Sequence, residues 1–158
     1  MNNNVTIYDI LYPKYKITKP IRLIELFGGY GSQALALKYL GVEFEHWKLV
    51  EWAIKSIQAY KDIHFSDKDV KLNSNRTKEE IIDFLYNKGI SKNYNVSMTK
   101  EQISRMNEKE LKSIIKNIYI THNLVDIKSV KGKDLEIFDT EHFTYLLTYL
   151  LFPLSRFK

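Results

Sequence analysis

A short apolar run followed at once by closely spaced glycines constrains this chain more than any other feature. Residues 21–27 (IRLIELF) are mostly apolar, and three of the next four residues are glycines (Gly28, Gly29 and Gly31). Such a run is typical of a buried parallel strand that enters a tight turn. Ser32 can cap a helix after this turn, with a stop at Gly41. The segment therefore predicts a strand, a glycine turn and a helix.

The following residues repeat this order. Residues 44–52 (FEHWKLVEW) predict a second strand with Glu51 near its carboxyl end, and residues 53–63 predict an amphipathic helix. Strands that alternate with helices are typical of an α/β domain with a parallel sheet. We expect a short strand at residues 124–127 and a final strand at residues 143–151, which gives a mostly parallel sheet of about four strands.

The middle of the chain has a helical pattern. One predicted helix runs through Ile81 and Leu85 and ends at Gly89. The residues from Thr99 to Gln102 form a capping-box pattern that opens a second helix toward Tyr119. Because 158 residues suffice for one ordinary domain, we expect a single domain over residues 1–158 with a helical insertion at about residues 76–123.

The glycine turn is suited to a nucleotide-like ligand. Glycines allow the backbone to approach a ligand closely, and the free N–H groups of a helix N-terminus favour a polar or anionic group. Residues 29–34 (GYGSQA) match the G-x-G-x-x-A dinucleotide pattern, and Glu51 lies about twenty residues further on, where a ribose-binding acid is expected. The spacing is therefore compatible with NAD, with S-adenosylmethionine, and with a turn that only makes room for packing.

The residues around the glycines resemble the DNA cytosine-5 methyltransferase family, in particular its phage-like and mycoplasma-like members. Residues 25–32 (ELFGGYGS) match the first family motif, D/E-L-F-x-G-x-G-G, except at Ser32, and the pair Glu51-Trp52 matches the end of the second strand. Residues 125–127 (VDI) are similar to the third motif, G-D-I, and residues 143–153 are similar to the strand before the Pro-Cys motif. This resemblance implies a partial Rossmann-like S-adenosylmethionine-dependent methyltransferase fold.

The resemblance also implies a cofactor site for S-adenosylmethionine. Its residues would be Phe27, Gly29, Tyr30, Gly31, Glu51, Trp52, Asp126 and Ile127. Glu51 would accept hydrogen bonds from the ribose hydroxyls, Trp52 would stack near the adenine, and Asp126 would meet the adenine edge. A ribose diol requires a bidentate acceptor and an exocyclic amine requires a carboxylate, so the chemistry agrees. From the residues alone, Asp126 is equally compatible with a solvated loop acid and Trp52 with a core residue.

The chain has no cysteine. This excludes disulfides, Cys-ligated zinc and a thiol nucleophile. Methylation at carbon 5 of cytosine needs a thiolate that adds to carbon 6, and the family supplies it in Pro-Cys-Gln, where this chain has Pro153-Leu154-Ser155. We therefore expect a truncated N-terminal fragment, produced by a frameshift near Pro153, that is inactive alone and binds the cofactor weakly. Methyltransferase motifs in the downstream DNA would support the frameshift hypothesis.

The basic charge is concentrated in one region. Residues 87–133 contain ten Lys and Arg against four Asp and Glu, or +6, whereas the whole chain carries +5. This pattern favours contact with DNA through the helical region, although a solvated helix surface explains it as well. The alternatives to an inactive fragment are one subunit of a split methyltransferase, an NAD-binding module and a non-enzymatic DNA-binding protein.

The remaining expectations concern association, metals and location. If the family's strand order holds, residues 145–152 form an exposed apolar edge strand, which predicts a homodimer. The four histidines show no i, i+4 pairing, so we expect no metal site. The start of the chain is Asn-rich and no apolar stretch reaches the roughly 20 residues of a membrane span, which predicts a cytoplasmic protein.

Overall fold

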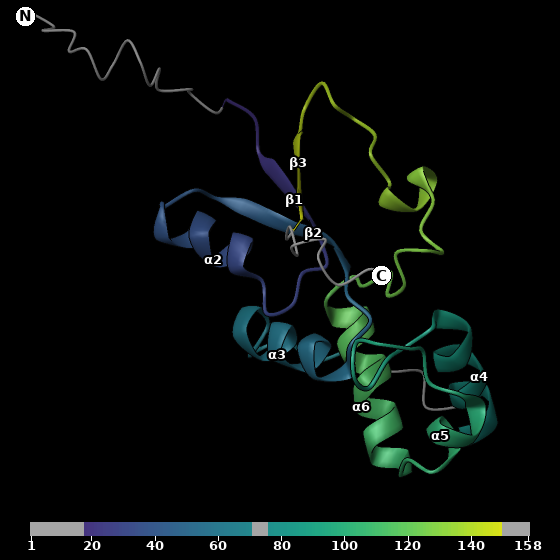
Figure 1. The fold of residues 1–158 in the computed structure, drawn as a ribbon. Helices are drawn as coiled ribbons and strands as arrows, with labels where there is room; N and C mark the ends of the chain where they lie inside the picture. The colour runs from purple at the N-terminus through teal and green to yellow at the C-terminus, as the bar shows by residue number, and fades with distance from the viewer. Residues whose placement is uncertain (1–17, 71–75, 150–158) are drawn as a thin grey trace, which may run out of the picture.

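The computed structural model describes residues 18–70 and 76–149 (Figure 1). The elements in chain order are β1 (Ile21–Leu26), α2 (Ser32–Tyr39), β2 (Phe44–Val50), α3 (Ile54–His64), α4 (Lys78–Lys88), α5 (Lys100–Ser104), α6 (Glu108–Ile120), the short 3-10 helix η1 (Gly132–Leu135) and β3 (Thr144–Tyr149). The strands form a three-stranded parallel sheet in the order β2-β1-β3. The predicted α/β class is confirmed, and the arrangement is consistent with a partial Rossmann-like methyltransferase fold.

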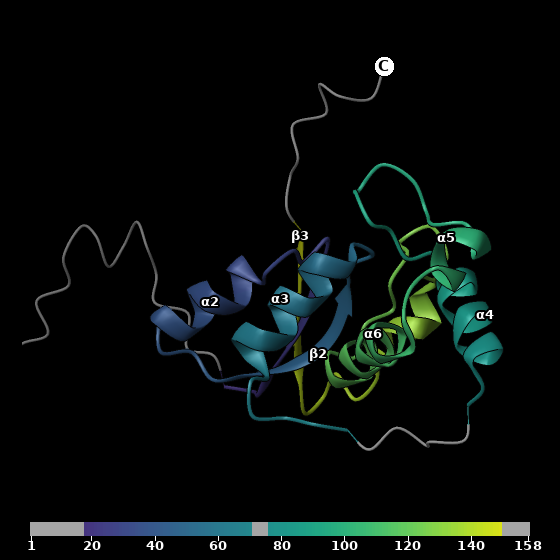
Figure 2. The ribbon, with the colours of Figure 1, turned by 90° about the horizontal axis from the view of Figure 1, so that it is seen from below.

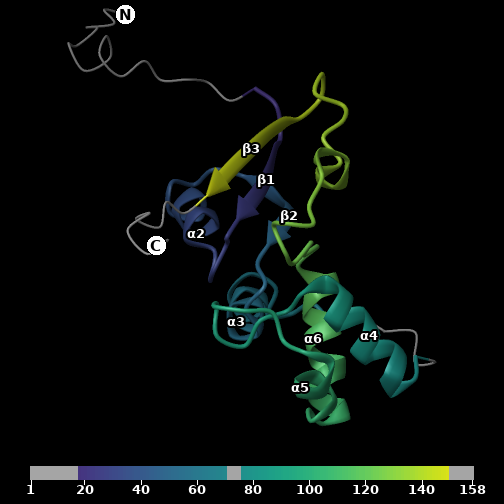
Figure 3. The same cartoon turned by 45° about the vertical axis from the view of Figure 1, so that its right-hand side comes forward.

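β1 lies at the centre of the sheet, between β2 and β3 (Figure 3). Ile21 pairs with Phe44 on one side and with Thr144 on the other. The last strand therefore lies beside the first, as predicted. The expected fourth strand near residue 124 is reduced to a parallel bridge in which Leu124 N donates to Leu49 O at 2.8 Å. It ends there because Val125 has a φ of 75°, which an extended strand does not accommodate.

The helix boundaries agree with the sequence patterns except at two places. Gly31, with a φ of 83°, is the N-cap of α2, so Ser32 is the first helical residue and does not cap it as expected. The helix predicted from Thr99 to Tyr119 is interrupted after Ser104. The side chain of Asn107 accepts a hydrogen bond from Glu110 N and starts α6 as a new helix.

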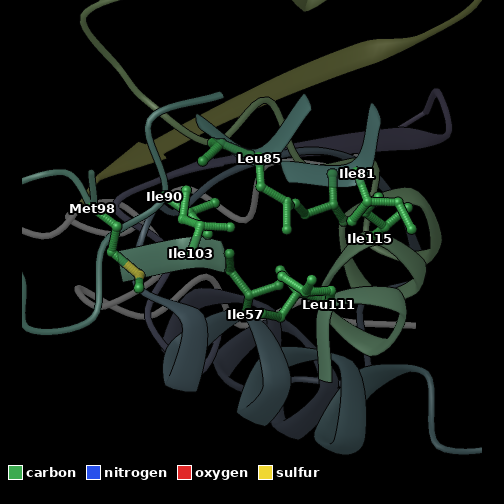
Figure 4. Packing of buried hydrophobic residues seen from close by; sticks show 11 residues of the cluster. Ile57, Ile81, Leu85, Ile90, Met98, Ile103, Leu111 and Ile115 are labelled. Atoms are coloured by element: carbon green, nitrogen blue, oxygen red, sulfur yellow. The ribbon is translucent and has the colours of Figure 1, made fainter. Parts of the chain in front are cut away.

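Two helices cover one face of the sheet, and the other helices pack beside α3. Figure 2 shows α2 and α3 next to each other on the sheet, with α4, α5 and α6 grouped to one side. The main apolar core fills the space between α3 and this group (Figure 4). Its members are Ile57, Ile81, Leu85, Ile90, Met98, Ile103, Leu111, Ile114, Ile115, Ile118 and Val125. Helices α4, α5 and α6 are therefore joined to α3 through a shared core.

The segment between η1 and β3 crosses the other face of the sheet. The Trp47 indole N–H donates to Leu135 O at 3.0 Å, and the guanidinium of Arg22 stacks 3.9 Å from the Trp47 ring and 3.4 Å from the Phe143 ring. These contacts fix the loop before it enters β3. Within residues 18–70 and 76–149, no helix is long and apolar enough to cross a membrane.

Candidate cofactor site

The glycine turn follows directly after β1 and has an unusual backbone. Phe27, Gly29 and Gly31 all have positive φ, at 54°, 55° and 83°. Gly31 N donates to Gly28 O at 2.7 Å and closes the turn. Phe27 is 40% exposed although it follows a buried strand. A left-handed conformation at a bulky residue is costly and is found most often at functional sites.

Glu51 joins the end of β2 to this turn. Its Oε2 accepts a hydrogen bond from Gly29 N at 2.9 Å, and its Oε1 accepts one from Ala53 N at 2.8 Å. The residue is 5% exposed, and burial raises the pKa of its carboxyl group. Each carboxylate oxygen has two acceptor positions, so Glu51 can bind these two N–H groups and still accept hydrogen bonds from a ligand.

Asn123 holds Glu51 in place and was missed in the sequence analysis. Its Oδ1 accepts from Glu51 N at 3.1 Å and from Val125 N at 2.9 Å, while its Nδ2 donates to Glu51 O at 2.8 Å. Asn123 is 4% exposed. These three bonds connect the Glu51-Trp52 motif to the Val125-Asp126-Ile127 motif. The only signal in the sequence is its position just before the latter motif.

Replacing Asn123 with alanine is expected to destabilise the fold by about 3 kcal/mol or more. The substitution leaves buried backbone groups of Glu51 and Val125 without partners, and each such group costs about 1–3 kcal/mol. Chemical denaturation measures the loss. Asn87→Ala, at an exposed position of α4, is the control and should change the stability little. Equal stability of the two variants would show that the hydrogen bonds of Asn123 to Glu51 and Val125 do not stabilise the fold.

The other residues implied by the resemblance lie around this centre. Trp52 is half-buried, packs against the helical core, and accepts a hydrogen bond from Ser91 N at its carbonyl oxygen. Asp126 Oδ1 accepts from Lys128 N at 3.0 Å, and its side chain lies beside Gly89 at the end of α4. Ile127 is half-buried. The structure thus brings Gly29 and Glu51 into direct contact, and Asn123 bonds Glu51 to Val125, the residue before Asp126.

A buried polar chain lies beneath the glycine turn, and no pattern in the sequence predicts it. The Tyr60 hydroxyl donates to Glu25 Oε2 at 2.5 Å, and Glu25 Oε1 accepts from Ala34 N at 3.2 Å. His46 Nδ1 lies 2.8 Å from the Tyr60 oxygen, so it must donate, because the hydroxyl proton is used on Glu25. The chain connects β2, α3, β1 and α2, and burial lowers the pKa of His46 to about 3.

The neutral state of His46 makes the fold sensitive to acid. His46 has an ordinary pKa of 6.5 and a lowered pKa in the fold, so the unfolded chain binds more protons between these values. The neutral His46 therefore contributes its full share of the free energy of unfolding above pH 6.5. This contribution is lost as the pH falls, by at most about 1.4 kcal/mol per pH unit. We expect chemical denaturation to show this loss between about pH 6.5 and about pH 5.

His46→Gln is the matched variant for this prediction. Its amide can still donate to Tyr60 but cannot be protonated in this range. The raised pKa values of Glu25 and Glu51 act in the opposite sense, and they are present in both proteins. The variant should therefore lose less stability than the wild type on acidification. Parallel pH dependence of the two proteins would contradict the assignment.

Two surface grooves of the described residues lie away from the glycine turn and Glu51. One of about 410 Å³ is lined by residues of β2, α4 and α6, including Trp47, Phe84 and Tyr119, and another of about 500 Å³ lies between α3 and α6. Gly29 and Glu51 line neither of them. The glycine turn and Glu51 are therefore identified by their hydrogen bonds and backbone geometry rather than by an enclosed cavity.

Comparison with known proteins relates the chain to a methyltransferase. No model of a protein family matches the chain. Over 136 residues, or 84% of its length, the chain is 32% identical to the Orphan methyltransferase M.SssI of Spiroplasma monobiae. The matched region is 34% of that protein, so the chain spans about a third of its relative's length. The sequence similarity, together with the α/β fold and its glycine turn, supports a methyltransferase family for this chain.

Proposed function

We propose that this chain is the S-adenosylmethionine-binding part of a DNA cytosine-5 methyltransferase. The observation that carries the proposal is the contact of Gly29 N with Glu51 Oε2 at 2.9 Å, which joins the glycine turn of the first motif to the acid of the second. Methyltransferases in general use S-adenosylmethionine, and the relative is named a methyltransferase. The cytosine-5 class is supported by the motifs at residues 25–32, 51–52 and 125–127.

The geometry suggests how the cofactor is held. The ribose hydroxyls donate to the free acceptor positions of Glu51, whose two oxygens are already oriented by backbone N–H groups. The exposed rings of Phe27 and Tyr30 border the turn and offer apolar contact to the remainder of the ligand. Trp52 and Ile127 provide apolar surface for the adenine, and Asp126 accepts from its exocyclic amine.

Methyl transfer needs groups that these residues do not provide. A thiolate nucleophile is required for the cytosine-5 reaction, and the sequence contains no cysteine. We expect this chain alone to transfer no methyl group from labelled S-adenosylmethionine to DNA. A chain that carries the missing thiol and recognition elements would complete the activity in a split enzyme. Methylation of cytosine by the chain alone would contradict the assignment.

The deciding experiment is a calorimetric titration with S-adenosylhomocysteine and, in parallel, with NAD. We expect saturable binding of the homocysteine compound and none of NAD. A ligand at about 100 times its dissociation constant stabilises the fold by about 2.7 kcal/mol, which a thermal melt can confirm. Binding of NAD alone would favour the dinucleotide-binding alternative. Binding of neither ligand would mean that the glycine turn serves packing only.

Contact with DNA through residues 87–133 is a second proposal. In the structure Lys100 pairs with Asp83 at 2.6 Å, Lys116 pairs with Asp69 at 3.1 Å, and Lys112 pairs with Glu108. These pairs reduce the positive charge that the region offers to phosphates. We expect binding to duplex DNA that weakens steeply with salt, measured by fluorescence anisotropy. Salt-independent or absent binding would favour the solvated-surface interpretation.

Association through residues 145–152 is proposed on the position of β3. β3 is an edge strand of the described sheet, and its Leu147 is 48% exposed; residues 150–152 lie outside the described ranges. An exposed apolar edge invites pairing with a second copy. Light scattering at micromolar concentration is expected to give the mass of a dimer, and a monomer would count against edge pairing.

A further inference from the structure

We propose that His64 is a positioning residue for the glycine turn at residues 28–31. Its neutral imidazole stabilises the turn conformation in which Gly29 N–H donates to Glu51. The inference rests on the proposed function and adds a residue and a pH response that the cofactor motifs do not contain. His64 is the last residue of α3, and Figure 2 shows α3 lying beside α2 on the sheet.

His64 touches the turn at two points. Its Nε2 lies 2.9 Å from the carbonyl oxygen of Tyr30. Its ring also fills the space beneath Gly31, because a Cβ built on Gly31 would overlap His64 Nε2. A residue that touches both Tyr30 and Gly31 restricts the rotation of the peptide unit between them. This peptide unit determines where the turn leads into α2.

The hydrogen-bond partners define which nitrogen carries the proton. The Tyr30 carbonyl only accepts, so Nε2–H must donate to it. The ammonium of Lys38 only donates, and it lies 3.2 Å from His64 Nδ1, which must therefore be the unprotonated acceptor. Lys38 on α2 thus selects the neutral tautomer that can support the turn.

Protonation of Nδ1 would keep the Nε2–H donor to Tyr30, so its effect on the turn would come from repulsion between the imidazolium and Lys38, which displaces the ring. An imidazolium has no acceptor nitrogen for Lys38, and it would place two positive charges about 3 Å apart. The groups that face the ring are Lys38 from α2, His46 from β2 at a centroid distance of 4.9 Å, and Tyr60 from α3 at 4.5 Å. Burial foremost, and then Lys38, lower the pKa of His64, whereas its bonds to the Tyr30 and Gly31 backbone raise it.

The test compares wild type, His64→Gln and His64→Leu in calorimetric titrations with S-adenosylhomocysteine at about pH 8 and about pH 5. Glutamine can donate to the Tyr30 carbonyl but does not titrate, whereas leucine fills space without a donor. At the higher pH we expect His64→Gln to bind S-adenosylhomocysteine as tightly as wild type. We expect His64→Leu to bind it about 10-fold more weakly, which corresponds to the loss of one hydrogen bond. At the lower pH we expect wild type to weaken by about 10-fold relative to His64→Gln. Titration of Glu51 affects both proteins and cancels in this ratio.

A second readout needs no ligand. The backbone amide NMR signal of Gly31 should shift with a titration below pH 6.5 in wild type that is absent from His64→Gln, whereas the Gly29 signal also follows the titration of Glu51 in both proteins. Lys38→Met, which removes the neighbouring charge, should move this midpoint to higher pH. The absence of this titration, or equal binding by all three proteins at both pH values, overturns the role of His64. If the titration occurs but S-adenosylhomocysteine does not bind, His64 positions the turn and the proposed function is the part that fails.

Discussion

Replacing Glu51 with glutamine is expected to weaken binding of S-adenosylhomocysteine by about 100-fold. The carboxylate is buried and oriented by Gly29 N and Ala53 N, so it is ready to accept from both ribose hydroxyls without rearrangement. A hydrogen bond to a charged group contributes about 1.5–3 kcal/mol, and two weakened bonds together account for a loss of this size. Calorimetric titration of both proteins measures the change.

The control for this substitution is Glu79→Gln, at an exposed position in the first turn of α4, which should bind like wild type. Glutamine at position 51 has one carbonyl oxygen for two backbone donors, so a moderate loss of stability, about 1–3 kcal/mol, is also expected. Melting curves recorded for each protein separate this effect from the loss of affinity. Binding within about threefold of wild type by folded Glu51→Gln would contradict a ribose-binding role.

Replacing Gly31 with alanine is expected to destabilise the fold by about 3 kcal/mol or more. Gly31 has a φ of 83°, and a non-glycine residue in the left-handed region costs roughly 1–2 kcal/mol. The added Cβ would also overlap His64 Nε2 and lie 2.8 Å from the Tyr60 ring, and forcing extra volume into a packed site costs about 1–3 kcal/mol. Thermal melting should show a decrease of about 6–12 °C.

Gly41→Ala is the matched control because Gly41 has a φ of 68° but no atom within 4 Å of an added Cβ. It isolates the backbone cost from the steric cost. Adding His64→Ala to Gly31→Ala should restore part of the stability, because it removes one of the overlapping groups. If Gly31→Ala and Gly41→Ala were equally stable, the close approach of His64 to the turn would be refuted.

Local rules explain most of what the sequence predicted correctly. The strand at Ile21–Leu26, the helix that ends before Gly89 and the capping box at Thr99 depend on residues within a few positions of each other. The helix from Thr99 was predicted too long because Asn107 was read as a helical residue. In the fold its side chain caps Glu110 N, and a short polar side chain competes with the helix backbone in this way.

The candidate site was only partly accessible from the sequence. The sequence pointed to Glu51 and the glycines together because their types and spacing match a dinucleotide-binding pattern, and the structure brings Gly29 N and Glu51 Oε2 into contact. Asn123 was not found, since its three bonds to Glu51 and Val125 depend on β2 meeting a segment 72 residues away. Ser32 was wrongly expected to cap α2, because the tightness of the turn makes Gly31 the N-cap.

The sequence by itself determined the order of strand, glycine turn and helix, because glycine conformation, capping and apolar periodicity act over a few residues. It also determined that no thiol chemistry is available within these residues. Only the tertiary structure decided what lies beneath the turn. His46, Tyr60 and Glu25 come from three different elements and form one hydrogen-bonded chain. Buried polar groups must find partners, and packing rather than sequence spacing brings those partners within reach.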